Sequence, residues 1–294
     1  MLAVTVTGPP LRSDRPPHPE ERAPMSEHQK RERTGADPTQ SFTGLTENYQ
    51  AFRPDYPAPI LDTLGEHLRA GATDAWPSPW LLLDVGSGTG ISTRALRSLV
   101  GPRPRVVGVE PGRDMFHAAE AEGGGVEYVN ARAEDVPFPD GSAVLVLTAQ
   151  AVHWFDRPAF FAETARLLAP GGTLAVLNNN RDYTGSAFVD DHEALLERYS
   201  PGYDRRYRQF DLVGEMSEVP GLAGATEHTH HWTRVLTSDE YLGMALSSSR
   251  MAAAARELGE ERTRAEIRAV ADRHFPDGRV VIPYTTQLVV ARRV

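Results

Sequence analysis

Short apolar runs alternate with amphipathic segments through the middle of the chain. Runs with the length of β-strands lie at 81–85 (LLLDV), 106–110 (VVGVE), 126–130 (VEYVN), 143–149 (AVLVLTA) and 173–179 (TLAVLNN). Segments with helical spacing lie between them, at 91–100, from residue 113 onward and at 158–169. Continuous apolar strands separated by helices are typical of a parallel sheet covered on both faces. The pattern predicts a doubly wound, Rossmann-like α/β domain.

The segments on either side of this alternation predict additional elements. Apolar residues between Ile60 and Leu68 fall on one helical stripe, and Gly71 suits the end of that helix. Residues 181–225 lose the periodicity and are rich in Tyr and Arg, which suggests an inserted cap. Order resumes after residue 225, as strands at 231–236 and 284–292 and helices over 249–274. If these last two strands pair antiparallel, they complete a seven-stranded sheet.

Composition and charge narrow the classes of function. Lys and Arg number 31 against 40 Asp and Glu, and the formal net charge of -9 disfavours nucleic acid and anionic membrane surfaces as partners. The absence of Cys excludes disulfides, thiolate metal sites and thiol nucleophiles. No apolar run approaches the ~20 residues of a membrane span. We expect a cytoplasmic protein that is a monomer or a homodimer.

The glycine-rich segment GSGTG, residues 86–90, follows the first strand of the alternation. Glycines there let the backbone run close to a ligand. A dinucleotide fingerprint has the spacing G-x-G-x-x-G, whereas this segment has G-x-G-x-G, with Asp84 before the first glycine. Asp84 can hold an ammonium group directly or through water, and Glu110 ends the next strand, where it can accept both hydroxyls of a ribose. The pattern favours a nucleoside that carries an amino acid, and it disfavours an NAD-dependent oxidoreductase.

These residues resemble the signature of the class I S-adenosylmethionine (SAM)-dependent methyltransferases. The likeness covers roughly residues 45–180 and includes VVGVEPGRDM, ARAEDVPFPDGS, AQAVHWFD and LLAPGGTLAV. Within that family, YQAFRPDYP followed by AQAVHWFD is similar to the branch that includes trans-aconitate methyltransferase. The resemblance implies SAM as the cofactor and methyl transfer as the reaction.

The resemblance also implies which residues contact the cofactor. They are Gly86, Ser87, Gly88 and Gly90 along its methionine half, Glu110 on the ribose, Pro111 and Met115 beside the adenine, Ala133 and Glu134 at the adenine amino edge, and Gln150 and Ala151 on the floor of the site. Tyr49 and Arg53 match a lid segment, and Arg53 is a candidate partner for a carboxylate. Arg132 departs from the family, which often has Asp at that position.

His153 is the candidate catalytic residue. A sulfonium methyl group is already activated, so the protein must mainly align the acceptor and exclude water. A carboxylate acceptor needs no base, whereas a hydroxyl or amine gains from one, and imidazole titrates near neutrality. His153 can therefore serve as a base or as a plain part of the pocket wall. The candidate substrate contacts are Trp154, Tyr183 and Arg250. The serine run before Arg250 can simply cap a helix. The resemblance implies that this serine-rich turn approaches the substrate, which makes Arg250 a candidate anion anchor.

Two further clusters have weaker functional interpretations. Alternation along a strand places His228 and His230 on one face and His231 on the other, so we expect no metal site there. The Tyr and Arg residues at 199–208 can stack on an aromatic substrate, bind an acid, interleave with single-stranded nucleic acid, or form a solvated cap. The net charge argues against nucleic acid.

The sequence therefore predicts a SAM-dependent methyltransferase that acts on a carboxylate or hydroxyl oxygen of a small molecule, with a role in natural-product metabolism. The alternative is a SAM-binding protein of the same fold that catalyses another reaction, such as cyclisation, or that lacks transfer activity. The expected organisation is a disordered tail at 1–40, an N-terminal helical lid at 41–75, a SAM-binding core at 76–180, a substrate cap at 181–225, and strands and helices that complete the core at 226–294.

Overall fold

The structure is a computed structural model that describes residues 53–294. The expected tail, the first part of the expected lid and Tyr49 lie outside the described residues. The strands are β1 (Leu81–Val85), β2 (Arg105–Val109), β3 (Glu127–Val129), β4 (Ala143–Ala149), β5 (Leu168–Arg181), β6 (Leu222–Thr237) and β7 (Arg279–Arg293). The helices are α3 (Ala58–Gly71), α4 (Ile91–Val100), α5 (Arg113–Glu122), α6 (Arg157–Leu167), α7 (Ala187–Tyr199), α8 (Leu212–Ser217), α9 (Ser238–Leu246), α10 (Ser249–Leu258) and α11 (Glu260–His274).

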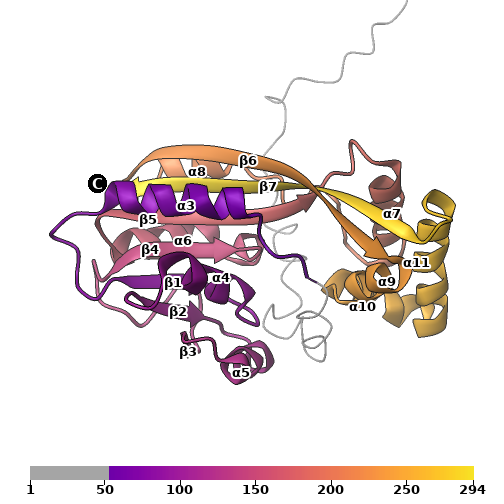
Figure 1. The fold of residues 1–294 in the computed structure, drawn as a ribbon, viewed down its shortest axis with the longest axis horizontal. Coiled ribbons are helices and arrows are strands. Elements are labelled where there is room, and N and C mark those ends of the chain that lie inside the picture. Colours follow the sequence, from indigo (N-terminus) through magenta and orange to yellow (C-terminus); the bar gives the residue numbers. More distant parts are fainter. Residues whose placement is uncertain (1–52) are drawn as a thin grey trace, which may run out of the picture. The chain divides into compact units, whose positions relative to one another are not determined.

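The strands form one seven-stranded sheet in the order β3-β2-β1-β4-β5-β7-β6 (Figure 1). Strands β1 to β5 pair in parallel, whereas β7 lies antiparallel between β5 and β6. The predicted seven-stranded α/β fold is confirmed. The strand order reverses between β1 and β4, and folds of this type bind ligands in the crevice beyond the carboxyl ends of the strands at that point.

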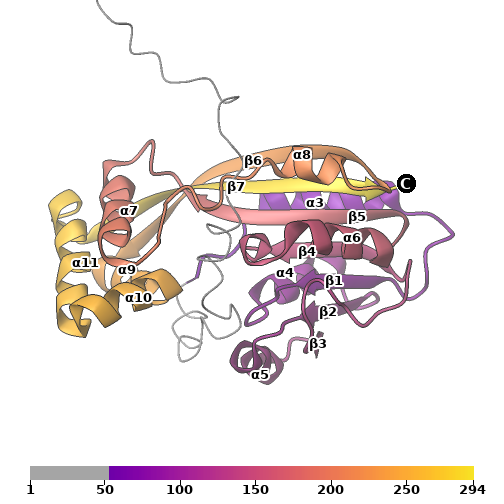
Figure 2. The same cartoon turned by 180° about the vertical axis from the view of Figure 1, so that it is seen from behind.

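Alternate residues of the central strands pack on opposite faces of the sheet. Leu83 and Val85 of β1 belong to a cluster with Phe160 of α6, whereas Leu82 packs in a different cluster with Leu64 of α3. Helices α3 and α4 therefore cover one face, and α6 and α8 cover the other, as a comparison of Figures 1 and 2 shows. Because both faces are covered, the central strands are fully buried, which explains their continuous apolar sequences.

Strand β6 is longer than the sequence indicated. The strand expected at 231–236 is only its last part, since β6 begins at Leu222. This strand lies at the edge of the sheet, and most of its residues are exposed or half-buried. Its polar segment EHTHH therefore stays in contact with solvent, and a search for apolar runs does not locate the start of the strand at Leu222.

Helices α7, α9, α10 and α11 form a helical group around their own apolar cluster (Figure 1). Phe188 and Leu196 of α7 pack there with Tyr241 of α9, Met251 of α10 and Ile267 of α11. The group thus combines the segment expected as a cap with helices from the segment 226–294. Helix α8 packs on the sheet instead, because Leu212 and Met216 join the sheet cluster. The domain boundaries given above stay a prediction.

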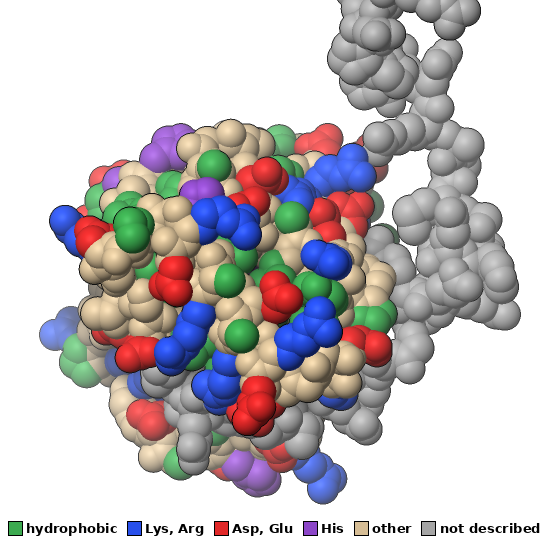
Figure 3. Space-filling view, turned by 90° about the vertical axis from the view of Figure 1, so that its right-hand side faces the viewer, with side chains coloured by type: hydrophobic (Ala, Val, Ile, Leu, Met, Phe, Trp, Pro, Cys, Tyr) green, Lys and Arg blue, Asp and Glu red, His purple; other side chains and the backbone are tan. Residues whose placement is uncertain are grey.

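The outer surface of the helical group carries charges of both signs. Figure 3 shows acidic and basic side chains interspersed over this end of the protein. On α11, Arg264 pairs with Glu260 at 2.8 Å and Arg262 with Glu266 at 3.9 Å, one helical turn apart. Over residues 53–294, no helix is both long enough and apolar enough to cross a membrane.

Candidate active site

A cavity lies at the carboxyl ends of the parallel strands. Gly86 follows β1, Glu110 follows β2 and Gln150 follows β4, and all of them line this cavity. Its far side consists of residues from the helical group and from the segment between Tyr203 and Gln209. Open α/β sheets bind ligands at this edge. The cavity is therefore the candidate active site, and it extends from the sheet to the helical group.

Most of the sequence-predicted site residues line this one cavity. They are Arg53, Gly86, Ser87, Gly88, Glu110, Pro111, Met115, Ala133, Glu134, Gln150, Ala151, His153, Trp154, Tyr183 and Arg250. Within the described part of the chain, Asp84 and Gly90 do not line it. The fold thus brings the predicted cofactor and substrate residues together, while the role of each stays a prediction. Of the expected lid at 41–75, the described residues that reach the cavity lie between 53 and 56, because α3 packs on the sheet.

Glycines shape the turn after β1. Gly86 has a φ of +75°, and a Cβ atom there would lie 2.6 Å from the Cβ of Ala151. Gly90 has a φ of +81°, and its Cβ would lie 2.0 Å from the hydroxyl of Tyr128. Any side chain at either position would be strained and would collide with a neighbour. Gly90 thus shapes the start of α4 instead of contacting the cavity.

Glu110 is tied to the glycine turn through its carboxylate. Its Oε2 accepts a hydrogen bond from the Gly88 amide at 2.9 Å, and its Oε1 accepts one from the Gly112 amide at 2.8 Å. Burial raises the pKa of Glu110, although both amide hydrogen bonds oppose the shift. These bonds fix an acidic side chain at the wall of the cavity, where a ligand with hydroxyl donors can meet it.

Asp84 lies directly beneath the turn and is completely buried. Its Oδ2 accepts hydrogen bonds from the hydroxyls of Ser92 at 2.7 Å and Thr93 at 2.6 Å, whereas its Oδ1 has no hydrogen-bond partner among the described residues. Burial raises the pKa of Asp84 to about 6, against the effect of these bonds. Because Asp84 does not line the cavity, a direct contact with a ligand ammonium would need some rearrangement, and a bridging water fits the present geometry better.

Gln150 holds a strained conformation at the floor of the cavity. Its φ is 60°, and among the described residues no other non-glycine residue has a positive φ. Its Oε1 accepts a hydrogen bond from Arg208 Nη1 at 2.7 Å, and its Nε2 donates to the carbonyl of Asn179 at 3.3 Å. Strain of this kind is common at binding sites, where the surrounding structure must enforce it. Gln150 thus connects the sheet with the segment that carries Arg208.

His153 lies in the 3₁₀ turn Val152–Trp154, which follows β4. Its ring contacts Tyr207 edge-on, with 5.1 Å between ring centroids, and lies 5.2 Å from the ring of Trp154. Burial, together with the charges of Arg208, Arg250 and Arg53, holds the pKa of His153 well below its usual range. The imidazole is therefore neutral at physiological pH and is a weak base.

A buried ion pair positions an aromatic residue on the far side of the cavity. Arg181 Nη2 contacts Glu193 Oε1 at 2.7 Å, and Glu193 Oε2 accepts a hydrogen bond of 2.5 Å from the Tyr203 hydroxyl. Burial raises the pKa of Glu193, but the charge of Arg181 outweighs it, and the pKa falls to about 2. Glu193 is therefore a carboxylate throughout the physiological range, and it holds Tyr203 as a fixed acceptor.

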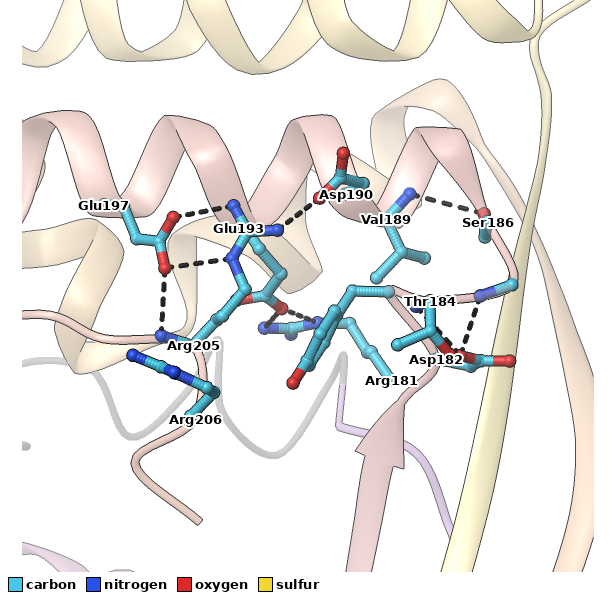
Figure 4. A network of polar contacts seen from close by, with 12 residues as sticks. Arg181, Asp182, Thr184, Ser186, Val189, Asp190, Glu193, Glu197, Arg205 and Arg206 are labelled. Carbon is cyan, nitrogen blue, oxygen red and sulfur yellow. Dashed lines mark hydrogen bonds and ion pairs between the residues drawn. The ribbon is translucent and has the colours of Figure 1, made fainter. Parts of the chain in front are cut away.

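A second set of contacts holds the segment 200–210 against α7. Arg205 pairs with Glu197 at 2.6 Å and also with Asp190, so it is fastened to α7 by two carboxylates (Figure 4). In the same view, Arg181 reaches Glu193 from the end of β5. Tyr203 and Arg205 are thus both held by acids of α7, and the chain that follows them carries Tyr207 and Arg208, which line the cavity.

Several residues that line the far side of the cavity were not named from the sequence: Asn179, Arg181, His192, Glu193 and Tyr284. Tyr203, Tyr207 and Arg208 also line it, and the sequence indicated them only as members of the Tyr and Arg cluster. The clustering of Tyr and Arg at 199–208 was a signal for some of them, but it did not distinguish residues that face the cavity from exposed ones. Nothing in the sequence pointed to Glu193, which lies in a helix with many other acids.

The histidines near residue 230 have separate partners. His228 Nε2 lies 3.0 Å from Nε2 of His67, and His231 Nδ1 lies 2.9 Å from the hydroxyl of Thr285. Between residues 53 and 294, no three His, Asp or Glu side chains are grouped so that they could hold a metal ion.

Comparisons with known proteins agree with this fold and site. A model of the methyltransferase domain family matches residues 83–176. An uncharacterized methyltransferase of Mycobacterium tuberculosis is 36% identical over 210 residues, which cover 71% of this chain and 76% of the relative. A candidate methyltransferase of Dictyostelium discoideum is 31% identical over 220 residues, covering 72% of this chain and 78% of the relative. The structure of a candidate type II methyltransferase from Anaeromyxobacter dehalogenans matches with a TM-score of 0.57 and 28% identity, over 82% of this chain and 98% of that one.

The sheet order, the glycine turn and the acidic residue after β2 define a class of enzyme that transfers methyl groups from a nucleoside donor. Together with the matches, they show that the chain belongs to the class I SAM-dependent methyltransferases.

The residues of the cavity fit this cofactor. The carboxylate of Glu110 accepts a hydrogen bond from the Gly88 amide of the glycine turn, and the Oδ1 of Asp84, which has no hydrogen-bond partner among the described residues, lies below that turn. Glu110 would hold the ribose, the Gly86–Gly88 turn would run along the amino-acid half, and Met115 would pack on the base. When bound, SAM supplies an activated methyl group. The protein must then orient the acceptor and exclude water.

Proposed function

We propose that this enzyme transfers the methyl group of SAM to an oxygen atom of a small molecule, with a carboxylate oxygen favoured over a hydroxyl. The observation that carries this proposal is the state of the acids that line the cavity. Glu193 is paired with Arg181, Glu134 lies 3.4 Å from Arg132, and both oxygens of Glu110 accept backbone amides. Each acid that the described residues contribute to the cavity wall therefore already has a partner, and none is left to deprotonate an acceptor.

The imidazoles of the cavity are weak bases as well. Burial and nearby arginines lower the pKa of His153, and burial followed by the charge of Arg181 lowers that of His192 to about 3. His192 also uses its Nδ1 in a contact of 2.8 Å with the Tyr241 hydroxyl. A hydroxyl acceptor benefits from a base, whereas a carboxylate is already ionised and needs only to be positioned. The cavity is thus better suited to a carboxylate, with His153 as a part of the wall that orients it.

Transfer of labelled methyl groups tests this proposal. The protein is incubated with SAM that carries a labelled methyl group and with sets of carboxylic acids, phenols and amines of similar size. We expect labelled methyl esters, which mild alkali hydrolyses to labelled methanol. Label that is found only on nitrogen or carbon, or in no product at all, would contradict the proposal. The similarity to the trans-aconitate methyltransferase branch and the role in natural-product metabolism stay predictions. The carboxylic acids that accept the label in this experiment test both of them.

A further inference from the structure

Arg208 and Arg250 differ from other arginines of the cavity in the groups that hold them. Arg181 is neutralised by the buried Glu193, and Arg205 is neutralised by two acids of α7. In the range 53–294, by contrast, neither Arg208 nor Arg250 forms an ion pair with a carboxylate. The cavity therefore contains two guanidinium groups whose charge no described acid of the protein cancels.

Neutral groups orient both of these arginines. Arg208 Nη1 donates to the amide oxygen of Gln150 at 2.7 Å. Arg250 lies among three aromatic rings, with its Cζ 5.7 Å from the centroids of Trp154 and Tyr203 and 5.5 Å from that of Tyr207. Aromatic faces and amide oxygens position a guanidinium without removing its charge. Both groups are thus fixed in place and still able to bind an anion.

The two arginines meet at one aromatic residue. The Cζ of Arg208 lies 5.0 Å from the ring centroid of Tyr207, on which Arg250 also packs. The Nε of Arg208 is buried and has no hydrogen-bond partner among the described residues. Arg250 belongs to the first turn of α10, whose N-terminal residues Ser248 and Ser249 line the cavity and add partial positive charge. A buried donor without a partner, beside two uncancelled charges, is what a bound anion would satisfy.

We propose that Arg208 and Arg250 form an anion subsite around Tyr207, which holds a carboxylate or phosphate group of the acceptor. The acceptor is then an organic acid or a phosphate ester, and Arg208 and Arg250 determine this specificity. The subsite rests on the proposed function, since it assigns the substrate class at the same cavity. Its binding step can nevertheless be measured without methyl transfer.

Calorimetric titration of the protein saturated with S-adenosylhomocysteine tests the subsite. The probes are acetate, benzoate and inorganic phosphate, with acetamide and benzamide as neutral counterparts of the two acids. We expect at least one anion to bind and the amides to bind more weakly. Affinity for that anion should fall about tenfold or more in Arg208→Met and in Arg250→Met, and Arg250→Lys should restore part of it, because an ammonium group keeps the charge.

Arg206→Met is the matched control. Arg206 belongs to the same segment, but its side chain is exposed and pairs with Asp204, so this variant should bind the anion as the wild type does. Absence of anion binding, equal binding of acids and amides, or unchanged affinity in both arginine variants would overturn the subsite. Anion binding without methyl transfer would contradict the proposed function alone. Transfer to neutral acceptors without anion binding would contradict the subsite alone.

Discussion

Asp84 is a buried carboxylate that the protein retains at a cost to its stability. Its raised pKa, at about 6, means that ionisation disfavours the folded state. Below the ordinary carboxyl pKa, Asp84 is protonated in both the folded and the unfolded protein, and the folded state has its full stability. As the pH rises through 6, this stability is lost, because Asp84 must then ionise in its buried position. A residue that is kept in spite of such a cost is expected to serve binding. Here the expected ligand is the ammonium group of the cofactor.

The variant Asp84→Asn should separate stability from binding. Without cofactor, it should be more stable than the wild type at pH 7 by about 1 to 3 kcal/mol, and the difference should vanish near pH 4. Its affinity for S-adenosylhomocysteine should fall by about tenfold or more, because an amide cannot pair with an ammonium group. Urea unfolding at both pH values and calorimetric titration measure these effects. Asp114→Asn, at an exposed position of α5, is the control, and equal behaviour of the two variants would refute the role of Asp84.

Replacement of His153 shows whether this residue is a general base or only orients the acceptor. If the acceptor is a carboxylate, His153→Asn should lower kcat by less than about tenfold, whereas loss of a general base costs about 100-fold or more. The reason is that a carboxylate needs no deprotonation at neutral pH. Steady-state kinetics with the best acid acceptor provide the measurement. A loss of several hundredfold that is accompanied by a shift of the pH profile would show that His153 is a base.

At the scale of elements, the junction of β5, α7 and the segment 200–210 determines the shape of the far side of the cavity. Arg181 comes from β5, Glu193 from α7, and Tyr203 from the segment that follows α7. The ion pair between Arg181 and Glu193 is buried on the Glu193 side, since Glu193 is only 3% exposed. Removal of Glu193 leaves the guanidinium of Arg181, whose side chain is 25% exposed, without its counter-ion, which is destabilising.

Glu193→Gln should therefore destabilise the protein and disturb Tyr203. We expect the free energy of unfolding to fall by about 3 kcal/mol at pH 7. Because the pKa of Glu193 is lowered to about 2, the difference from the wild type should persist at neutral pH and shrink as the pH falls from about 4.5 towards 2. Denaturant unfolding over this range measures it. Glu197→Gln, which weakens the more exposed pair with Arg205, should cost less than about 1 kcal/mol, and a larger cost there would contradict this ranking.

At the scale of the whole molecule, the sequence predicted the sheet well because its central strands are buried on both faces. Each of them is a continuous apolar run, as LLLDV and AVLVLTA show. Edge strand β6 has no such run. The helical group was harder to predict, because its cluster joins α7 to α10 and α11, which are far away in sequence. Periodicity within one segment cannot reveal which distant helix will cover it.

The two halves of the cavity were predictable to different degrees for a similar reason. Cofactor candidates such as Gly86 and Glu110 follow directly after strands, so their place at the sheet edge follows from the topology. Arg208 and Tyr203 lie in a segment without periodicity, and only the contacts with Gln150 and Glu193 place them at the cavity. The donor could therefore be inferred from the sequence, whereas on the acceptor side the sequence named only part of the wall, including Trp154 and Arg250, and the structure placed Arg208 and Tyr203 beside it.

A crystal structure of the protein with S-adenosylhomocysteine and the best-binding acid tests the central claim most directly, because it shows donor and acceptor in one cavity. The account predicts the cofactor along the Gly86–Gly88 turn, with its ribose at Glu110. It places the carboxylate of the acid in contact with Arg208 and Arg250, beside His153. An acid bound outside this cavity, or one whose carboxylate faces away from both arginines, would contradict the account.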